Sequence, residues 1–266
     1  MIPPEQAPYR PDYRLPLLGL AGFAVSLLLG RRRSFARDSG VIMRNNPYPR
    51  RVEGLDHVPP EGPYVLVMNH HNRVGLRPYH CAMVVSAALG SRPGRPEICW
   101  ALTSEMYGKH IGPFPIPVAL VRWTLRRVAH SYGFVVLPRR PELVEGRAAG
   151  LRRLLRALES RPIGIMPEAA GSGKLLTPPA GSGLFLATLA RHKAKLVPLG
   201  AWEEEDGTLV VRFGEPFAIP QIGIAKSEAD RLVREQVMVA IGRLLPERLW
   251  GDYYDAISRS YSSSAG

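Results

Sequence analysis

From Arg50 onward, short apolar segments alternate with longer segments in which apolar and charged positions recur at helical spacing. A short apolar run bounded by Pro, Gly or polar residues is typical of a buried strand, and a long amphipathic run is typical of a helix that covers a sheet. The pattern predicts an α/β fold, with a mostly parallel sheet flanked by helices in a single domain. The predicted strands are residues 51–55, 64–68, 97–102, 133–137, 163–166, 195–201 and 209–213. The predicted helices are residues 79–89, 118–132, 143–159, 182–192 and 227–244.

An uncharged apolar run at residues 15–30 is bounded by Arg14 on one side and by the arginines at 31–33 on the other. It is 16 residues long, whereas a helix that crosses a bilayer usually needs about 20. Pro16 and the glycines in the run weaken a helix further, so the sequence favours a shallow or re-entrant membrane anchor. A spanning helix and an ordinary buried helix stay open as alternatives. The flanking arginines would meet anionic headgroups and hold the rest of the chain on the cytoplasmic face.

We expect the chain to divide into an N-terminal membrane-associating segment at residues 1–45, an α/β domain at 46–250 and a C-terminal tail at 251–266. The tail is rich in serine from Ser258 onward, and we expect it to be frayed. Segment 114–132 interleaves apolar and Trp side chains with arginines, which suits a helix at a membrane interface. A helix that packs its apolar face on the sheet would have the same composition.

The net charge of the chain indicates which class of partner it binds. Its 266 residues carry a formal net charge of +12, with thirty arginines and five lysines, which suggests an anionic partner. The sequence has neither zinc-ligand spacing nor a glycine-aromatic motif for base stacking, so an anionic membrane surface is expected and no nucleic acid. Arginines that simply coat a solvated surface are the alternative. Cys81 and Cys99 are too few for a disulfide framework, which favours a reducing compartment.

The first candidate site residues are Asn69 and His70, which directly follow the predicted strand at 64–68. An imidazole titrates near neutrality, and loops at the carboxyl ends of strands are where open α/β sheets place their sites. His70 is therefore a candidate general base. Another strand exit carries Gly-Ser-Gly-Lys at 171–174, but Glu and Leu stand where a phosphate-binding loop needs a glycine and a hydroxyl residue, so the spacing excludes such a loop.

Four segments in chain order resemble the glycerolipid acyltransferases, the family typified by lysophosphatidic acid acyltransferase. Asn69 and His70 are similar to the opening of its NHxxxxD motif, and residues 133–139 (GFVVLPR) to its glycine, hydrophobic stretch and arginine. Residues 166–172 (MPEAAGS) resemble FPEGTRS, and Val-Pro at 197–198 resembles a short block that follows a helix. The resemblance implies transfer of a fatty acyl group from an acyl-CoA or acyl carrier protein thioester to a hydroxyl of a lysophospholipid or other lipid-like acceptor.

One departure from the family's pattern concerns the base. Position 75 is Gly, where the family's aspartate would orient the imidazole and stabilise its protonated form. No Asp or Glu occurs from residue 62 to residue 96, so a replacement carboxylate would come from elsewhere in the chain. The candidates are Glu168, Glu105 and Asp56.

Two further departures concern the acceptor. In the family, an arginine and a lysine help to hold the acceptor's phosphate, and here Gly171 and the neighbourhood of Thr103 and Ser104 take their places. A buried phosphate without cationic partners is poorly held, which argues against glycerol phosphate or lysophosphatidate as the acceptor. Arg139 is retained, and Arg73 and Arg77 would bring charge from a new direction.

The predicted site follows from these residues and the resemblance. His70 is the expected base, acting directly on the acceptor hydroxyl without a covalent acyl-enzyme. No bound cofactor or metal is expected, and the acyl thioester is a co-substrate. A catalytically silent relative that serves as a lipid-binding or membrane-scaffolding module is the alternative, and a thioesterase, in which water replaces the alcohol, is a third. The expected substrate-binding residues are Asn69, Arg73, Arg139, Glu168 and Ser172.

Overall fold

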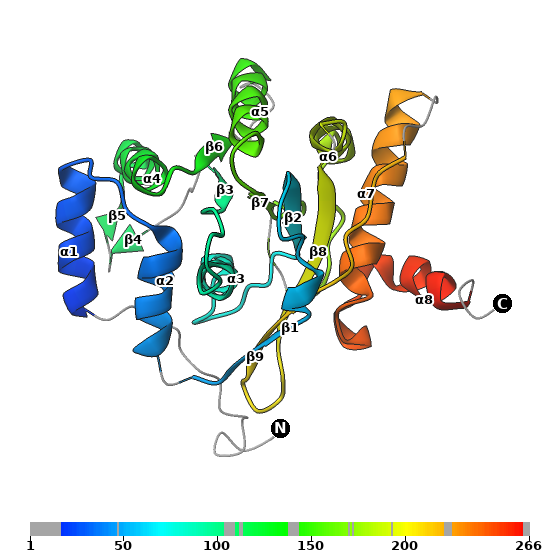
Figure 1. Ribbon diagram of the computed structural model, residues 1–266, viewed down its shortest axis with the longest axis horizontal. Helices are drawn as coiled ribbons and strands as arrows, with labels where there is room; N and C mark the ends of the chain where they lie inside the picture. The colour runs from blue at the N-terminus through cyan, green and yellow to red at the C-terminus, as the bar shows by residue number, and fades with distance from the viewer. Residues whose placement is uncertain are drawn as a thin grey trace.

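The computed structural model describes residues 17–262, except residues 47, 104–109, 112–113, 138–143, 170, 172, 193 and 221–224. A seven-stranded sheet forms its centre, and helices cover both faces of that sheet (Figure 1). The predicted α/β class, with a mostly parallel sheet flanked by helices, is confirmed. The strands of the sheet are β1 (Arg50–Glu53), β2 (Tyr64–Met68), β3 (Cys99–Thr103), β6 (Val135–Leu137), β7 (Ile163–Ile165), β8 (Lys195–Glu203) and β9 (Leu209–Phe213).

The strands lie in the order β1-β9-β8-β2-β7-β3-β6. All pairs from β8 to β6 are parallel, whereas β9 runs antiparallel to β8 and pairs in parallel with β1. Strand β2 lies in the middle, and all five of its residues are buried. A strand covered on both faces needs a continuous apolar sequence, which Tyr-Val-Leu-Val-Met provides. The carboxyl ends of β8, β2 and β7 therefore lie side by side at one edge of the sheet.

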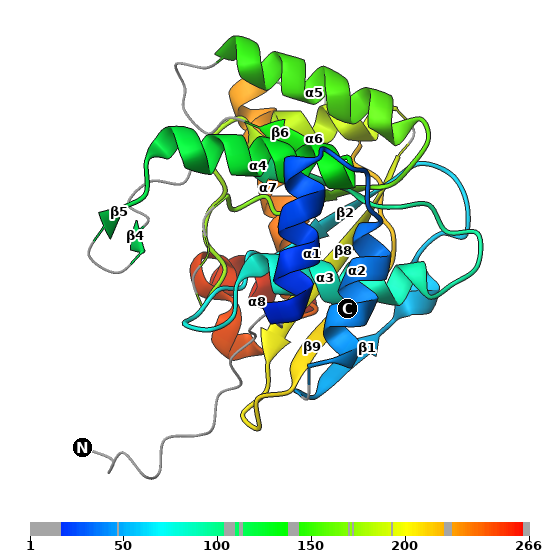
Figure 2. The same cartoon turned by 90° about the vertical axis from the view of Figure 1, so that its left-hand side faces the viewer.

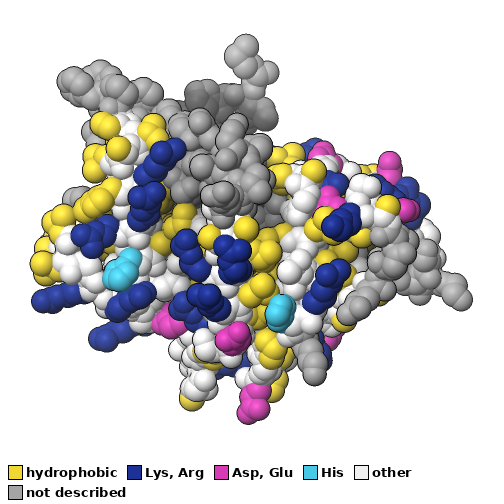
Figure 3. Space-filling model, turned by 90° about the horizontal axis from the view of Figure 1, so that it is seen from above, with side chains coloured by type: hydrophobic (Ala, Val, Ile, Leu, Met, Phe, Trp, Pro, Cys, Tyr) yellow, Lys and Arg dark blue, Asp and Glu magenta, His cyan; other side chains and the backbone are white. Residues whose placement is uncertain are grey.

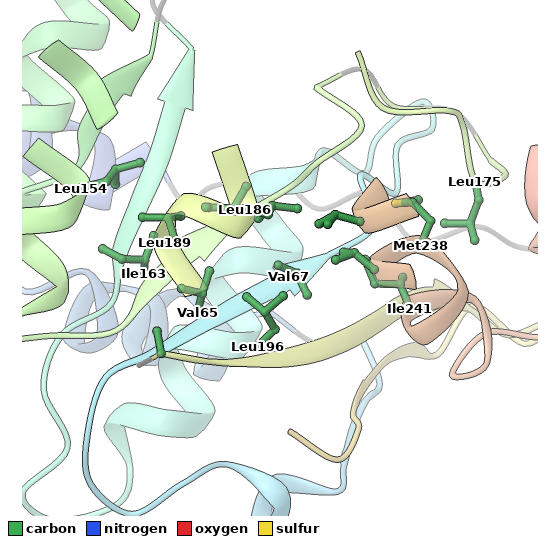
Figure 4. Packing of buried hydrophobic residues seen from close by; sticks show 14 of the residues in the cluster. Val65, Val67, Leu154, Ile163, Leu175, Leu186, Leu189, Leu196, Met238 and Ile241 are labelled. Carbon is green, nitrogen blue, oxygen red and sulfur yellow. The ribbon is translucent and has the colours of Figure 1, made fainter. Parts of the chain in front are cut away.

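Two apolar cores lie on opposite faces of this sheet. Along β2, Leu66 and Met68 pack into one core and Val65 and Val67 into the other, because successive side chains of a strand point to opposite faces. Figure 4 shows the second core, where leucines of one helix and Met238 of another meet the strand side chains. The helices of the first core are α2 (Phe35–Arg44) and α3 (Pro78–Gly90), and those of the second are α5 (Val144–Leu158), α6 (Ser182–Ala190) and α7 (Lys226–Gly242).

All seven predicted strands and all five predicted helices are present, with ends that differ from the prediction by at most two residues. Helix α2, the short β4–β5 pair (His110–Ile111 with Phe114–Pro115) and helix α8 (Tyr254–Ser262) were not predicted. The expectation of a frayed end from Ser258 is wrong as far as Ser262. There the helix holds because Ile257 is fully buried against the second core and Tyr261 stacks on Trp250.

Helix α1 (Leu17–Leu28) packs beside α4 (Val118–Tyr132), as Figures 1 and 2 both show. The link from α1 to α2 is bonded to the domain: Arg33 donates to both oxygens of Asp38 at 2.5 and 2.8 Å, and the Tyr132 hydroxyl donates to Asp38 at 2.9 Å. Within the described residues, no helix combines the length and apolar character that crossing a membrane requires. Helix α1 contacts the domain through α4, and most of the apolar side chains described on it are exposed.

Candidate active site

Two loops meet at the carboxyl edge of the sheet. One connects β2 to α3 (residues 69–77, the His70 loop), and the other leads from β7 towards α6 (residues 166–181, the Glu168 loop). Because β2 and β7 are parallel neighbours, both loops leave the sheet at the same edge. This is the edge at which the sequence predicts the site.

Asn69 fixes the start of the His70 loop. Its side-chain nitrogen donates to the Ala201 carbonyl at 2.8 Å, and the Ala201 N–H donates to its side-chain oxygen at 2.7 Å. The amide thus imitates a backbone pair and extends the contact between β2 and β8 past the end of β2. Asn69 is 6% exposed, and its bonds are those of a residue that positions the loop. Its contact with a substrate stays a prediction.

Glu168 joins the two loops. One carboxylate oxygen accepts the backbone N–H of His70 at 2.7 Å, and the other accepts the backbone N–H of Leu176 at 2.8 Å. The residue is only 3% exposed, and burial raises the pKa of its carboxyl to about 7 in spite of these two bonds. The group therefore holds a proton over part of the neutral range. Its contact with an acceptor hydroxyl stays a prediction.

The three candidates for a replacement carboxylate differ in where they lie relative to His70. Glu168 does lie beside His70, but its bond goes to the backbone of that residue. Asp56 follows β1, which runs opposite to β2, so it lies towards the other edge of the sheet and pairs with Arg92 at 2.6 Å. The suggestion that Asp56 orients His70 is therefore wrong. Glu105 lies outside the described residues, so the structure says nothing about it.

Position 75, where the family has its aspartate, lies in a tight turn. The backbones of Arg73 and Leu76 bond to each other in both directions, at 3.0 and 3.2 Å, with Val74 and Gly75 between them. Gly75 has φ of +84°, a left-handed conformation that glycine adopts without the steric penalty of a side chain. The turn holds Val74 91% exposed at its tip. The absence of an aspartate at position 75 therefore reflects the shape of this loop, because an aspartate with this backbone conformation would strain the turn.

Gly171 stands where the family has an arginine that helps to hold the acceptor's phosphate, and its surroundings explain why a large side chain is absent. A Cβ atom on this residue would lie 2.2 Å from the Nδ1 atom of His70 and 2.6 Å from the His70 carbonyl oxygen. The backbone of the Glu168 loop therefore packs directly against the imidazole, and the close approach leaves no room for the family's arginine side chain. Two other predicted substrate-binding residues, Arg139 and Ser172, lie outside the described residues.

The guanidinium of Arg73 is engaged by a residue that the sequence did not single out. Its Nε and Nη2 atoms donate to the two carboxylate oxygens of Glu203, and its Nη1 atom donates to the Val74 carbonyl. The same carboxylate lies 3.9 Å from the Nε2 atom of His71. Glu203 ends β8, two residues beyond the predicted end of that strand. An acid at the carboxyl end of a strand next to β2 was the available signal. A role of Arg73 in holding an acceptor stays a prediction.

The Glu168 loop is held from its far side by the C-terminal part of the chain. The Leu175 N–H donates to the Leu249 carbonyl at 2.9 Å, and the Asp252 N–H donates to the Leu175 carbonyl at 3.1 Å. The Asp252 carboxylate in turn accepts both the N–H and the hydroxyl of Thr177, at 2.8 and 2.9 Å. Leu175 itself is 1% exposed. Since Leu176 bonds to Glu168, these contacts support the carboxylate that touches His70.

No family model matches the chain, and no curated protein matches it. Among solved structures, it is similar to the crystal structure of the 1-acyl-sn-glycerophosphate (LPA) acyltransferase PlsC from Thermotoga maritima. The superposition has a TM-score of 0.48 and 15% sequence identity, and it covers 79% of this chain and 76% of that one. Similarity at this level does not establish the family, the activity or the substrate of this chain.

Ala169, next to Glu168, has φ of +57° and is the one described residue other than glycine with a positive φ. The left-handed conformation raises the energy of an L-residue by about 1–2 kcal/mol, and glycine avoids most of that strain. We expect Ala169→Gly to increase the free energy of unfolding by about 0.5–1 kcal/mol, because the relief exceeds the entropy that glycine adds to the unfolded chain.

Urea unfolding checks this prediction, with Ala148→Gly as the matched control. Ala148 is exposed within α5, where glycine should lower the free energy of unfolding by about 1 kcal/mol. Equal losses of stability in the two variants would show that position 169 carries no backbone strain.

A basic and apolar surface lies on the side of the molecule formed by α1 and α4. Figure 3 shows arginine and lysine side chains beside hydrophobic ones on the face that carries α4 and α5. Helix α4 leads into the amino end of β6, which is parallel to β3, so its first turns lie towards the carboxyl edge where His70 is found. The large apolar side chains exposed on α1, just after it and on α4 are Leu20, Val25, Leu28, Leu29, Leu120 and Trp123.

Proposed function

We propose that the protein is a membrane-associated acyltransferase that moves a fatty acyl group from an acyl-CoA or acyl carrier protein thioester to a hydroxyl of a lysophospholipid or other lipid-like acceptor. The observation that carries the proposal is the placement of His70. Its imidazole packs against the Glu168 loop at the carboxyl edge of a parallel sheet, and its backbone is fixed by the buried Glu168 carboxylate. The resemblance of both loops to acyltransferase motifs supplies the reaction class.

In this reaction His70 accepts the proton of the acceptor hydroxyl as the oxygen attacks the thioester carbonyl. A new C–O bond forms, the carbonyl becomes a tetrahedral intermediate, and the C–S bond then breaks. The leaving thiolate takes the proton from the imidazolium, so the enzyme returns to its starting state. The attack is direct, and no acyl-enzyme forms.

The acceptor we propose is one that does not depend on the family's two phosphate-holding cations. Gly171 leaves no room for a side chain beside His70, and the Arg73 guanidinium is bonded to Glu203. A lysophospholipid with a larger headgroup, or a neutral lipid alcohol, places less demand on a bidentate cation than a phosphate monoester does. Arg139 stays the proposed contact for any charged group of the acceptor.

The test is release of free thiol from an acyl thioester by the purified protein, with and without lipid alcohols. Acyl transfer requires that thiol release depend on the acceptor and that the acyl group appear as its ester. Free fatty acid in place of the ester would identify a thioesterase. Lipid binding without thiol release, for every acceptor supplied, would favour the alternative of a silent lipid-binding or scaffolding module and would end the enzyme proposal.

The α1 and α4 surface is the proposed membrane contact, on the cytoplasmic face. We expect Trp123→Ser and Leu28→Ser each to weaken binding to vesicles containing anionic phospholipid by at least about 5-fold, because each removes apolar area that the bilayer would bury. Vesicle co-sedimentation measures the effect. Trp123 and Leu28 are 41% and 63% exposed, so folding should be little affected.

Tyr254→Ser is the matched control for this experiment. Tyr254 is 48% exposed on α8, at the opposite end of the molecule from α1 (Figure 1). Its replacement should leave vesicle binding unchanged. If all three variants bind as the wild type does, the contact surface lies elsewhere.

A further inference from the structure

A buried cluster of ionisable side chains holds the His70 loop on the side away from Glu168. Arg73 and His71 come from the loop, and Glu203 comes from the end of β8. The side chains of His71 and Glu203 are each 10% exposed, and that of Arg73 is 13% exposed. Charged groups buried to this degree are normally paired, as Arg73 and Glu203 are.

The register of the sheet brings the three residues together. The Asn69 side chain pairs with the backbone of Ala201, so two residues further along each segment His71 lies near Glu203. The turn at Val74 and Gly75 then folds the loop back and returns Arg73 to the same carboxylate. The arrangement depends on the length of β8, which continues past the end of β2 to reach this point.

The carboxylate of Glu203 stays ionised in this setting. Burial by itself would raise its pKa, but the nearby His71 together with the hydrogen bonds and positive charge of Arg73 lowers the pKa below its ordinary value. The parallel, two-pronged contact with Arg73 fixes direction as well as distance, because both the guanidinium and the carboxylate are planar. A loop held in this way has little freedom to rotate about the end of β2.

We propose that Glu203 is the positioning residue of this site, anchoring the His70 loop from strand β8. It acts through Arg73 and His71, and Glu168 acts on the opposite side through the backbone of His70. Two carboxylates, one at the end of β8 and one in the loop after β7, thus hold one loop from both sides of β2. The tight turn at Gly75 and the acid at 203 form a single arrangement, because the turn returns Arg73 to the Glu203 carboxylate.

The test compares Glu203→Gln with Glu204→Gln, and its turnover arm rests on the proposed acyl transfer. Glu204 is the neighbouring acid, with surface ion pairs to Arg51 and Arg248, and is the matched control. We expect Glu203→Gln to speed amide hydrogen exchange in residues 69–77 by about 10-fold or more while α7 stays protected. Turnover should fall by about 10-fold or more through kcat, with KM changed less than about 3-fold. The control should change neither quantity.

A double variant, Arg73→Met with Glu203→Met, separates positioning from folding. Removing both charges leaves no uncompensated ion, so this protein should fold even where Glu203→Gln does not. The proposal expects fast exchange in residues 69–77 and low turnover to persist in it. Wild-type exchange in Glu203→Gln, or wild-type turnover in the double variant, would overturn it. If the wild type turns over no thioester, the proposed function fails, and the exchange measurements still decide whether Glu203 anchors the loop.

Discussion

Replacing His70 with alanine is expected to lower acyl-thioester turnover by about 10³-fold, because a positioned general base contributes about 10²–10⁴-fold to such a reaction. The substitution should leave the fold intact. The bond that ties His70 to Glu168 uses the backbone N–H, which alanine retains, and the side chain is half-buried at the edge of the sheet. The measurement is thiol release under saturating thioester and acceptor, with thermal unfolding recorded in parallel.

His192→Ala is the matched control for His70→Ala. His192 is exposed after the end of α6, and its loss should change neither turnover nor stability. Turnover that survives in His70→Ala would remove this imidazole from the mechanism. Turnover that instead disappears only in His71→Ala would transfer the role of base to the histidine that lies beside Glu203.

The second large effect is a pH dependence of stability that Glu168 creates. The pKa of its carboxyl is about 7 in the folded protein against an ordinary value of 4.5, so the folded state holds this proton more tightly than the unfolded state does. The stabilisation is fully present below about pH 4.5 and is lost as the pH rises through 7. A shift of this size corresponds to about 3 kcal/mol.

Glu168→Gln removes this titration and provides the comparison. The free energy of unfolding of the wild type, minus that of the variant, should fall by about 3 kcal/mol between pH 4.5 and pH 8. Urea unfolding followed by tryptophan fluorescence at four pH values measures it. All other titrating groups are common to both proteins and cancel in the difference. Parallel stability curves would mean that Glu168 ionises in the fold as it does in water.

Periodicity predicted the sheet and its covering helices because those elements bury regular patterns of apolar side chains. Strand β2 is the clearest case, with five buried residues in a row and ends that match the prediction. Helix α2 was missed because only part of its surface is buried, by Phe35 and Met43, within a strongly basic segment. Helix α8 was missed because the sequence after Ser258 is rich in serine. The helix is held by a few contacts, such as the burial of Ile257 in the second core.

The candidate site could be predicted only in part, for a different physical reason. His70 and Glu168 stand directly after predicted strands, so strand order alone brings them to one edge. The bond of Glu168 to a backbone N–H, rather than to a ring, depends on loop conformation that no pattern of residue types encodes. Glu203 lies about 130 residues from its partner Arg73, and only the register between β2 and β8 makes them neighbours.

The anchoring of the Glu168 loop by Asp252 has a consequence for how the chain is made. Thr177 and the carboxylate that holds it are 75 residues apart in the sequence. On the ribosome, the loop is therefore synthesised well before the residues that fasten it. A nascent chain that ends after β9 would contain every strand of the described sheet but would lack the residues that fasten the loop. The loop that holds Glu168 beside His70 is therefore supported on its far side only after residues 249–252 have been made and have folded against it.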